Sequence, residues 1–561
     1  MTTPQPATDF PVPPDLEGFW QWDKMHCPRP QTPLTQEIFL NAVSRGFCNA
    51  MEEFACPVGL AYRVINYYAY MGLVPLDFGT ETMEGRIARY QEKMALMVPK
   101  IGELWEHEWL PSILPDLDKA RSLDYAAMRD AELLDTLDEL RQEFLHRYVI
   151  HGRINFVTIA ASWYADFYNE TFQPSDSTEP YLSLQGFPTR SVDAGRGLWR
   201  LSRMVRNDPG LMRSFEEVEP KDLVSHLERS DQGRRFVSEF RDYLEEFGWR
   251  SDAFELSDPT WRENSLIPVN ALQGYIHLDE EGDPDASFQD AVQQRERLLA
   301  QARERLAPSP DKLARFNELY EAARYYLNVT EDHNFYIDQV GHGVMRLPIL
   351  EIGRRLVLHG AITDENEVFM LFLAEIREGL AGKDLRSLVA QRKAEIEKWS
   401  KVLPPPALGE PPPPSDDPFA EAVEKMFGMP PEPSHDPSII TGIAASPGTV
   451  QGRAKVVRRL SEAGKVEPGD VLVCEMTMPA WTPLFSTVSA VVADTGGVLS
   501  HCAIVAREYR LPCVVQTIVG TAAIKDGMLL TVDGSKGIVR IDAQGRGPSN
   551  SGLELGSTRE G

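Results

Sequence analysis

The chain has 561 residues and a formal net charge of −27, and 42% of its residues are hydrophobic. A length of this order predicts two to four domains with ample material for a large core. The acidic balance argues against a nucleic-acid partner, because phosphate backbones favour clustered Lys and Arg. The net charge of the whole chain does not exclude an anionic ligand in a local pocket.

The cysteines and the first residues predict a cytoplasmic protein. Six cysteines show neither a C-x-x-C pair nor a disulfide-dense spacing, a pattern typical of reduced thiols. The opening residues lack the basic-then-apolar order of a signal peptide. No uncharged run approaches the length of a membrane span, so we expect no membrane contact.

Residues 1–402 are predicted to form a mainly helical region with one or two subdomains. Long stretches such as residues 133–153 and 288–306 combine strong helix formers with helical periodicity. A proline-rich stretch, residues 403–437, follows. Its prolines fix φ and remove hydrogen-bond donors, so we expect an extended linker outside helices and sheets, which lets the flanking domains move.

Residues 438–545 are predicted to form a compact α/β domain. Short Val- and Ile-rich segments bounded by Gly, Pro or Asp predict strands over residues 448–457, 470–476, 490–494, 513–517, 529–534 and 537–542. Residues 500–510 predict the main helix, which Leu511 and Pro512 end. Strands that alternate with short helices are typical of an α/β fold. The Gly- and Ser-rich residues 546–561 predict a disordered tail.

The segment "DTGGVLSH", residues 494–501, carries the strongest chemical signal. Gly496 and Gly497 permit unusual backbone angles and let a ligand approach the main chain closely. Ser500 is predicted to cap the next helix and so to place His501 in its first turn, where free N–H groups favour anions. This position suits a histidine that carries a phosphoryl group.

Several groups near His501 are candidates to support such a phosphoryl group. Thr495, Ser500 and the helix end would hold its negative charge, and Arg507 would pair with a phosphate or with Glu508. The alternative is a partly buried packing histidine in an ordinary capped helix. A metal site is disfavoured, because no His, Cys or carboxylate lies at ligand spacing around the histidine.

The run "TGGVLSHCAIVAREYRLPCVV", residues 495–515, resembles the phosphohistidine motif in the mobile domain of phosphoenolpyruvate-utilising enzymes. The resemblance extends through "TGIAASPGTVQGRAKVV", "EPGDVLVCEMTMPAWTPLF" and "IKDGMLLTVDGSKGIV". It implies that His501 is the phosphoryl carrier and that the domain is a swivelling β/β/α body. The proline-rich linker would then let this domain travel between two sites.

Full-length dikinases of that family also carry an ATP-grasp domain and a barrel that handles pyruvate. The first 400 residues contain no glycine-rich nucleotide loop, and no barrel-like alternation follows His501. We therefore expect a separate ATP-binding subunit, similar to ATP-grasp proteins, to load His501. ATP and magnesium are expected on that subunit, and no metal ligands are expected in this chain.

The helical region carries a second resemblance. "FGWRSDAFELSDPTWRENSLIP", residues 247–268, is similar to the substrate domain of rifampicin phosphotransferase. "WDKMHCPRPQTPLT" and "YYLNVTEDHNFYIDQVGHGVMRLPILEIGRRL" also suit the carrier/substrate subunits of phenylphosphate synthase and 4-methylbenzyl phosphate synthase. Those enzymes split their kinase and carrier halves between chains. The resemblance implies a relay from ATP, through phospho-His501, to the hydroxyl of a small aromatic substrate such as phenol or p-cresol.

Transfer to a hydroxyl needs positioning, charge stabilisation and a base for the proton. The candidate catalytic residues in the helical region are Asp332, His333, Arg250 and Glu255. Arg250 would offset charge on the moving phosphoryl group. Aromatic rings that suit a flat phenolic substrate are Trp22, Tyr67, Tyr68, Trp163, Tyr336 and Trp261.

Other functions remain open. Within the same class, the acceptor would be an antibiotic or another alcohol. In a different class, the chain would be a phosphocarrier or docking module without catalysis of its own, and a third alternative is an inactive remnant. A catalytic pocket needs a buried base that faces His501, whereas a docking surface needs an exposed apolar patch.

Overall fold

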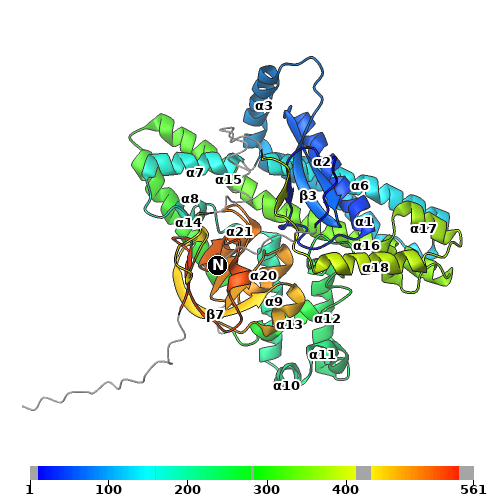
Figure 1. The fold of residues 1–561 in the computed structure, drawn as a ribbon. Coiled ribbons are helices and arrows are strands. Elements are labelled where there is room, and N and C mark those ends of the chain that lie inside the picture. The colour runs from blue at the N-terminus through cyan, green and yellow to red at the C-terminus, as the bar shows by residue number, and fades with distance from the viewer. Residues whose placement is uncertain (1–9, 158, 279–282, 412–430, 543–561) are drawn as a thin grey trace, which may run out of the picture.

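The structure is a computed structural model and describes residues 10–157, 159–278, 283–411 and 431–542. Figure 1 shows a large helical region, coloured blue to yellow-green, and a C-terminal sheet domain that packs against it. This confirms the predicted fold, a mainly α region followed by a mixed sheet domain. Within the described ranges, every helix is too short or too polar to cross a membrane.

The helical region is built from long helices that cross one another around a shared core. Close approach of α2 and α6 needs small residues: a Cβ added at Gly46 would lie 2.6 Å from the backbone carbon of Tyr148. The helices are α1 (Pro33–Thr35), α2 (Asn41–Glu53), α3 (Met83–Met97), α4 (Ile101–Leu104), α5 (Leu110–Ser122), α6 (Asp130–Phe156), α7 (Ile159–Phe172), α8 (Glu179–Leu182), α9 (Arg190–Arg206), α10 (Pro209–Glu217), α11 (Pro220–Leu227), α12 (Asp231–Phe247), α13 (Leu266–Tyr275), α14 (Pro284–Leu306), α15 (Pro310–His333), α16 (Gly341–Leu358), α17 (Leu373–Leu380) and α18 (Arg386–Ser400).

One irregular segment joins α15 to α16. The π-helix η6 (Asn334–Val340) continues directly from the first helix into the second. A π-helix has wider turns than an α-helix, so residues five apart, such as His333 and Asp338, face the same side. Segments of this kind are frequent at functional sites, and this one lies in the buried interior of the helical region.

A small antiparallel sheet flanks the helices. Its strands β1 (Trp20–Trp22), β2 (Val58–Ile65), β3 (Tyr68–Pro75) and β4 (Ala407–Leu408) are arranged in the order β2-β3-β1-β4. The turn between β2 and β3 has φ angles of 51° at Asn66 and 68° at Tyr67. Positive φ at both central residues is the mark of a hairpin turn whose twist matches the strands.

Strand β4 corrects one expectation about the proline-rich segment. Ala407 and Leu408 lie inside this segment, yet they pair with Gln21 and Trp20 of β1. The expectation that the whole segment stays outside sheets is therefore wrong for these two residues. They are not prolines themselves, so their backbone groups are free to pair at the edge of a sheet.

The C-terminal domain is an eight-stranded sheet in the order β5-β12-β11-β7-β8-β9-β10-β6. Strands β7 to β10 run parallel and the remaining pairs are antiparallel. All six predicted strands are present, and β5 and β6 add to them. The elements are β5 (Ile439–Thr441), β6 (Ile443–Ser446), β7 (Thr449–Val457), β8 (Val471–Cys474), β9 (Ala490–Ala493), β10 (Cys513–Val515), β11 (Leu529–Asp533), β12 (Ile538–Ile541), α20 (Thr482–Phe485), α21 (His501–Glu508) and α22 (Gly520–Ala523).

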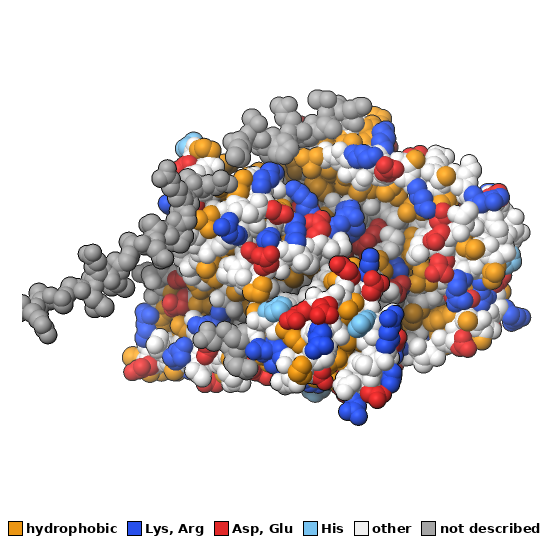
Figure 2. Space-filling view, turned by 90° about the horizontal axis from the view of Figure 1, so that it is seen from below, with side chains coloured by type: hydrophobic (Ala, Val, Ile, Leu, Met, Phe, Trp, Pro, Cys, Tyr) orange, Lys and Arg blue, Asp and Glu red, His pale blue; other side chains and the backbone are white. Residues whose placement is uncertain are grey.

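Polar contacts hold the sheet domain against the helical region. Asp252 accepts a hydrogen bond from the backbone N–H of Leu460 at 3.1 Å, and the Nζ of Lys24 lies 3.4 Å from Asp494. Figure 2 shows basic and acidic side chains interspersed over the face that it draws. The contacts between the two parts place helix α21 beside the helical region.

Candidate functional site

The loop before helix α21 is fixed by the buried carboxylate of Asp494. This residue follows β9 and accepts hydrogen bonds from the hydroxyl of Thr517 at 3.1 Å and from the backbone N–H of Thr521 at 3.0 Å. The hydroxyl of Thr521 donates to the other carboxylate oxygen at 2.5 Å. Asp494 is therefore a structural anchor that holds the loop against the sheet.

The glycine turn and the helix cap follow the sequence prediction. Gly496 has φ +106°, and a Cβ there would lie 2.9 Å from the Oγ of Ser500. The Ser500 side chain caps α21 by accepting a hydrogen bond from the backbone N–H of Ala503. His501 consequently occupies the first position of the helix. The backbone N–H groups of a helix start favour negative charge beside its ring.

His501 meets a carboxylate of the helical region. Its Nδ1 lies 3.0 Å from Oε1 of Glu331 on α15, and the two side chains are 10% and 2% exposed. The hydroxyl of Ser191 on α9 donates to the other oxygen of Glu331 at 3.0 Å. A carboxylate only accepts hydrogen bonds, so Nδ1 donates its proton. Nε2 is buried without a hydrogen-bond partner, and in a neutral imidazole with the proton on Nδ1 it is the nitrogen with the lone pair.

A small cavity with a volume of about 20 Å³ lies between α21 and the helical region. Its wall contains the carboxylates of Glu331 and Glu508. Glu508 accepts hydrogen bonds from the backbone N–H of Gly186 at 3.0 and 3.1 Å, and burial raises its pKa to about 7. The lining consists of Leu184, Phe187, Thr189, Ser191, Val192, Leu327, Asn328, Glu331, Ile504, Val505, Glu508 and Tyr509.

The predicted pair Asp332 and His333 has its functional groups in different environments. Asp332 accepts a hydrogen bond from the backbone N–H of Arg190 at 3.1 Å, and burial raises its pKa to about 6. His333 is buried, and its Nδ1 lies 3.1 Å from the carbonyl oxygen of Val329. Burial lowers the pKa of His333 to about 4, so the ring is neutral near pH 7.

Arg250 and Glu255, two of the predicted catalytic residues, have different partners. The guanidinium of Arg250 is buried between aromatic rings, 5.1 Å from Phe335 and 5.6 Å from Trp261. Burial lowers its pKa to about 10. Glu255 instead accepts hydrogen bonds from the hydroxyls of Thr32 at 2.6 Å and Thr35 at 2.5 Å. Through these contacts Glu255 connects the loop after α12 to Thr32 and Thr35 near the N-terminus.

Two residues that were predicted to bind phosphate, Thr495 and Arg507, donate hydrogen bonds to backbone carbonyl oxygens. The hydroxyl of Thr495 donates to the carbonyl oxygen of Glu475 at 2.9 Å. Arg507 is buried and donates to the carbonyl oxygens of Ala445 at 2.8 Å and Val498 at 2.9 Å. Arg507 therefore ties helix α21 to β6 and to its own loop. The pairing of Arg507 with a phosphate or with Glu508 stays a prediction.

Three of the predicted aromatic residues belong to the N-terminal sheet. The rings of Trp22 and Tyr68 meet edge-on at 5.6 Å between centroids. The hydroxyl of Tyr68 donates to the carbonyl oxygen of Trp399, and that of Tyr67 donates to Glu395 at 2.6 Å. Both partners lie on α18. These three rings therefore pack the sheet against α18.

The other predicted rings lie within the helical region. Trp163 is half-buried on α7, and Tyr336 of η6 packs 5.0 Å from Phe335 and 6.4 Å from Trp105 between centroids. Trp261 is fully buried beside Arg250. The aromatic side chains that line the cavity, Phe187 and Tyr509, are different ones.

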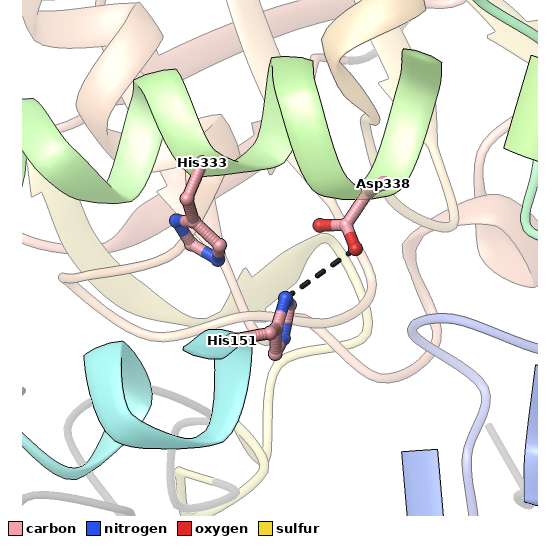
Figure 3. Close-up of side chains that lie close together, drawn as sticks. All are labelled: His151, His333 and Asp338. Atoms are coloured by element: carbon pink, nitrogen blue, oxygen red, sulfur yellow. Dashed lines mark ion pairs between the residues drawn. The ribbon is translucent and has the colours of Figure 1, made fainter. Parts of the chain in front are cut away.

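A second cluster of polar side chains lies deeper in the helical region. His151 of α6 faces His333 and Asp338, and its Nδ1 lies 3.3 Å from Oδ1 of Asp338 (Figure 3). The hydroxyl of Tyr148 donates to the same oxygen at 3.0 Å. Sequence reasoning did not include His151, and it noted Glu331 and Asp338 only as carboxylates near the candidates Asp332 and His333. The members of the cluster lie on helices far apart in the chain, and no local motif marks such a meeting.

Comparison with known proteins matches two parts of the chain. Residues 150–331 match the rifampicin phosphotransferase fourth domain, and residues 466–537 match the mobile domain of PEP-utilising enzymes. The second match contains the glycine turn and His501. The first match ends at Glu331, so the two residues in contact belong to the two matched parts.

Three relatives cover most of the chain. Chondramide synthase cmdD of Chondromyces crocatus is 32% identical over 95% of this chain. The uncharacterized phosphotransferase YvkC of Bacillus subtilis is 29% identical over 94%, and rifampicin phosphotransferase of Streptomyces sviceus is 26% identical over 77%. The aligned parts make up 14%, 62% and 50% of those proteins. The chain thus corresponds to only part of each relative.

Proposed function

We propose that the chain is a phosphotransferase of the phosphoenolpyruvate-utilising enzyme family in which His501 carries the phosphoryl group, because residues 466–537 match the mobile domain of that family and residues 150–331 match the rifampicin phosphotransferase fourth domain. The contact of His501 with Glu331 at 3.0 Å supports this proposal most directly. It brings a histidine at a helix start in the carrier domain against a buried carboxylate of the other domain.

The phosphoryl group is attached to Nε2 of His501. Because Nδ1 donates to Glu331, Nε2 holds the lone pair that attacks phosphorus. The N–P bond forms as the bond from phosphorus to the bridging oxygen of the nucleotide breaks. The donor is ATP, bound with magnesium on a separate ATP-grasp-like subunit. Magnesium neutralises phosphate charge in such transfers.

The second step moves the group to a hydroxyl. The acceptor oxygen takes the phosphoryl group as the N–P bond breaks, and Glu508 takes the hydroxyl proton. Glu508 is suited to this role because it lines the same cavity as Glu331 and has a pKa near 7. Arg250, buried near Glu331, offsets the charge that moves between the two partners.

The acceptor is a small aromatic alcohol, with phenol or p-cresol as the first choice. The cavity has a volume of about 20 Å³, room for a water molecule, so a phenol enters only when the surrounding side chains move apart. Apolar side chains, with the rings of Phe187 and Tyr509, line it and suit a flat apolar ring. A second candidate acceptor is an antibiotic, which the match of residues 150–331 to rifampicin phosphotransferase favours.

Chemical phosphorylation tests the carrier and the acceptor without any partner. We would incubate the whole chain with phosphoramidate, locate acid-labile phosphate by mass spectrometry, and then add phenol, p-cresol or rifampicin. We expect phosphate on His501 and its transfer to the phenols. His501→Ala should remain unlabelled. Glu508→Gln should be labelled normally but transfer about 100-fold more slowly, because its base is lost.

Each other outcome selects a different function. No acid-labile phosphate on the native chain would refute the carrier role. Phosphate that only rifampicin removes would replace phenols with an antibiotic acceptor. Phosphate that no hydroxyl compound removes would leave a carrier that docks elsewhere.

The ATP-binding partner needs its own experiment. The chain alone should take no label from ATP, and label should appear on His501 once the ATP-binding subunit and magnesium are added. Label acquired from ATP by the purified chain alone would contradict a separate subunit. The six free cysteines agree with a cytoplasmic location for this reaction.

A further inference from the structure

Three side chains in the helical region converge on one point, and one of them, His333, lies two residues after Glu331 in the chain. His333 and Asp338 project from the same side of the α15–η6 segment toward His151 of α6 (Figure 3). One ligand atom from each, two imidazole nitrogens and a carboxylate oxygen, lie within 4.8 Å of one another. Asp338 and His333 are each 2% exposed, whereas His151 is half-buried.

The hydrogen bonds of His333 leave one ring nitrogen available. Its Nδ1 lies 3.1 Å from the carbonyl oxygen of Val329, which can only accept, so Nδ1 carries the proton. Nε2 then holds a lone pair, and it is buried without a hydrogen-bond partner. A histidine that donates from one nitrogen to a backbone carbonyl and presents the other is the usual arrangement of a metal ligand.

Asp338, like His333, has one side-chain atom with hydrogen-bond partners and one without. The hydroxyl of Tyr148 donates to its Oδ1 at 3.0 Å, and His151 approaches this oxygen at 3.3 Å. Its other oxygen, Oδ2, is buried without a hydrogen-bond partner. Two buried and unpartnered polar atoms, Nε2 of His333 and Oδ2 of Asp338, therefore belong to one cluster. Buried groups without partners need an explanation, and a bound ion that contacts both atoms is one.

The local backbone explains how these ligands come together. In a regular α-helix, residues five apart point about 140° away from each other. The π-helix η6 begins directly after His333 and contains Asp338, and its wider turns bring the two side chains to one side. The irregular segment thus positions both of them toward α6.

We propose that His151, His333 and Asp338 form a binding site for a divalent transition metal, with zinc as the best match. Two imidazoles and one carboxylate are the ligand set of zinc sites that keep a further position open for water or substrate. A tetrahedral zinc with ligands at about 2.1 Å separates its donor atoms by about 3.4 Å. The ligand atoms lie within 4.8 Å of one another, so metal binding would require the half-buried side chain of His151 to move closer to the other two.

The alternative is a metal-free polar cluster, in which His151 and Asp338 form an ion pair. This alternative satisfies Oδ1 of Asp338 but leaves Oδ2 and the Nε2 of His333 without partners. A metal ion satisfies both. The proposal does not depend on phosphoryl transfer, and its test uses no phosphoryl donor.

The test measures zinc binding to the whole chain after a chelator has removed any bound metal. We expect one tight site by calorimetry, and intense visible absorption when cobalt replaces zinc, as tetrahedral coordination produces. His333→Gln and Asp338→Asn should each weaken binding by at least about 100-fold, since they remove ligands. His146→Ala is the matched control, because His146 lies on α6, as His151 does, but is exposed.

Two results would overturn the proposal. One is a native chain that binds zinc no more tightly than the His333→Gln variant does. The other is a cobalt complex of the native chain without tetrahedral absorption, a measurement that does not depend on whether the variants fold. Thermal unfolding of the metal-free variants would show whether their folds are intact.

Discussion

The two sides of the contact between His501 and Glu331 differ in how their residues are distributed along the chain. On the carrier side, the residues from Asp494 to His501 form one short run. On the helical side, Glu331 and its partner Ser191 come from α15 and α9. A capped turn is set by its near neighbours, whereas groups on separate helices meet only through tertiary packing. A carrier can therefore be read from a short motif, while its acceptor site cannot.

The largest expected effect comes from His501→Ala, which breaks the carrier side of this comparison. We expect phosphoryl transfer to fall by at least about 1,000-fold, because no other group replaces the nucleophile. The measurement is acid-labile phosphate on the intact chain. His435→Ala is the control, since His435 is exposed. Equal labelling of the His501→Ala chain would show that the carrier lies elsewhere.

Glu331→Gln tests the helical side and should lower transfer by about 100-fold or more. A neutral amide can present N–H to Nδ1 of His501, which favours the tautomer with the proton on Nε2. Single-turnover rates from the phosphorylated chain to the acceptor measure the effect. Glu321→Gln, an exposed change on the same helix, should leave the rate unaltered. An unchanged rate in Glu331→Gln would remove the positioning role.

Asp332→Asn tests the helical side through stability. Burial raises the pKa of Asp332 to about 6, so folding favours its protonated form. Its ionisation therefore costs stability as the pH rises from its usual pKa of 3.8 through about 6. Above pH 7 the variant should be more stable than the native chain by about 1–2 kcal/mol, since partial exposure reduces the full cost.

Thermal unfolding of both chains at pH 5 and pH 8 measures this difference. The gain should be larger at pH 8 than at pH 5. A gain of equal size at both pH values would show that ionisation of Asp332 is not its cause.

Trp22→Phe should have the smallest effect on function. Trp22 packs against Tyr68 in the N-terminal sheet and donates to the carbonyl oxygen of Cys27. We expect a loss of about 1–2 kcal/mol in stability and a KM for the acceptor within roughly twofold of the native value. A large rise in KM with unchanged stability would place this ring in the acceptor site after all.

The sequence alone was sufficient to predict those elements whose structure depends on residues close by in the chain. It predicted the six strands of the C-terminal domain, the Ser500 cap and the position of His501, since all depend on neighbours in the chain. It missed the hairpin of β2 and β3, although Asn66 beside Tyr67 is a turn signal. Arg250 and Glu255 looked like partners because they are close in sequence. Packing gave each a different environment.

The contacts of Glu331 and His151 could not be predicted from the sequence, for one shared physical reason. Glu331 looked like any acidic residue on a helix, and only the arrival of α9 and α21 buries it. His151 gained partners only because η6 turns His333 and Asp338 toward α6. No spacing rule for regular helices predicts that pairing.

Strand β4 sets the length of the tether that holds the carrier domain. The chain is anchored at Leu408 on one side, and on the other Glu432 accepts a hydrogen bond from Thr441. About 20 residues lie between these anchors, and their fully extended span is roughly 75 Å. If His501 carries the phosphoryl group as proposed, a connection of this length limits how far the carrier domain can move from the helical region.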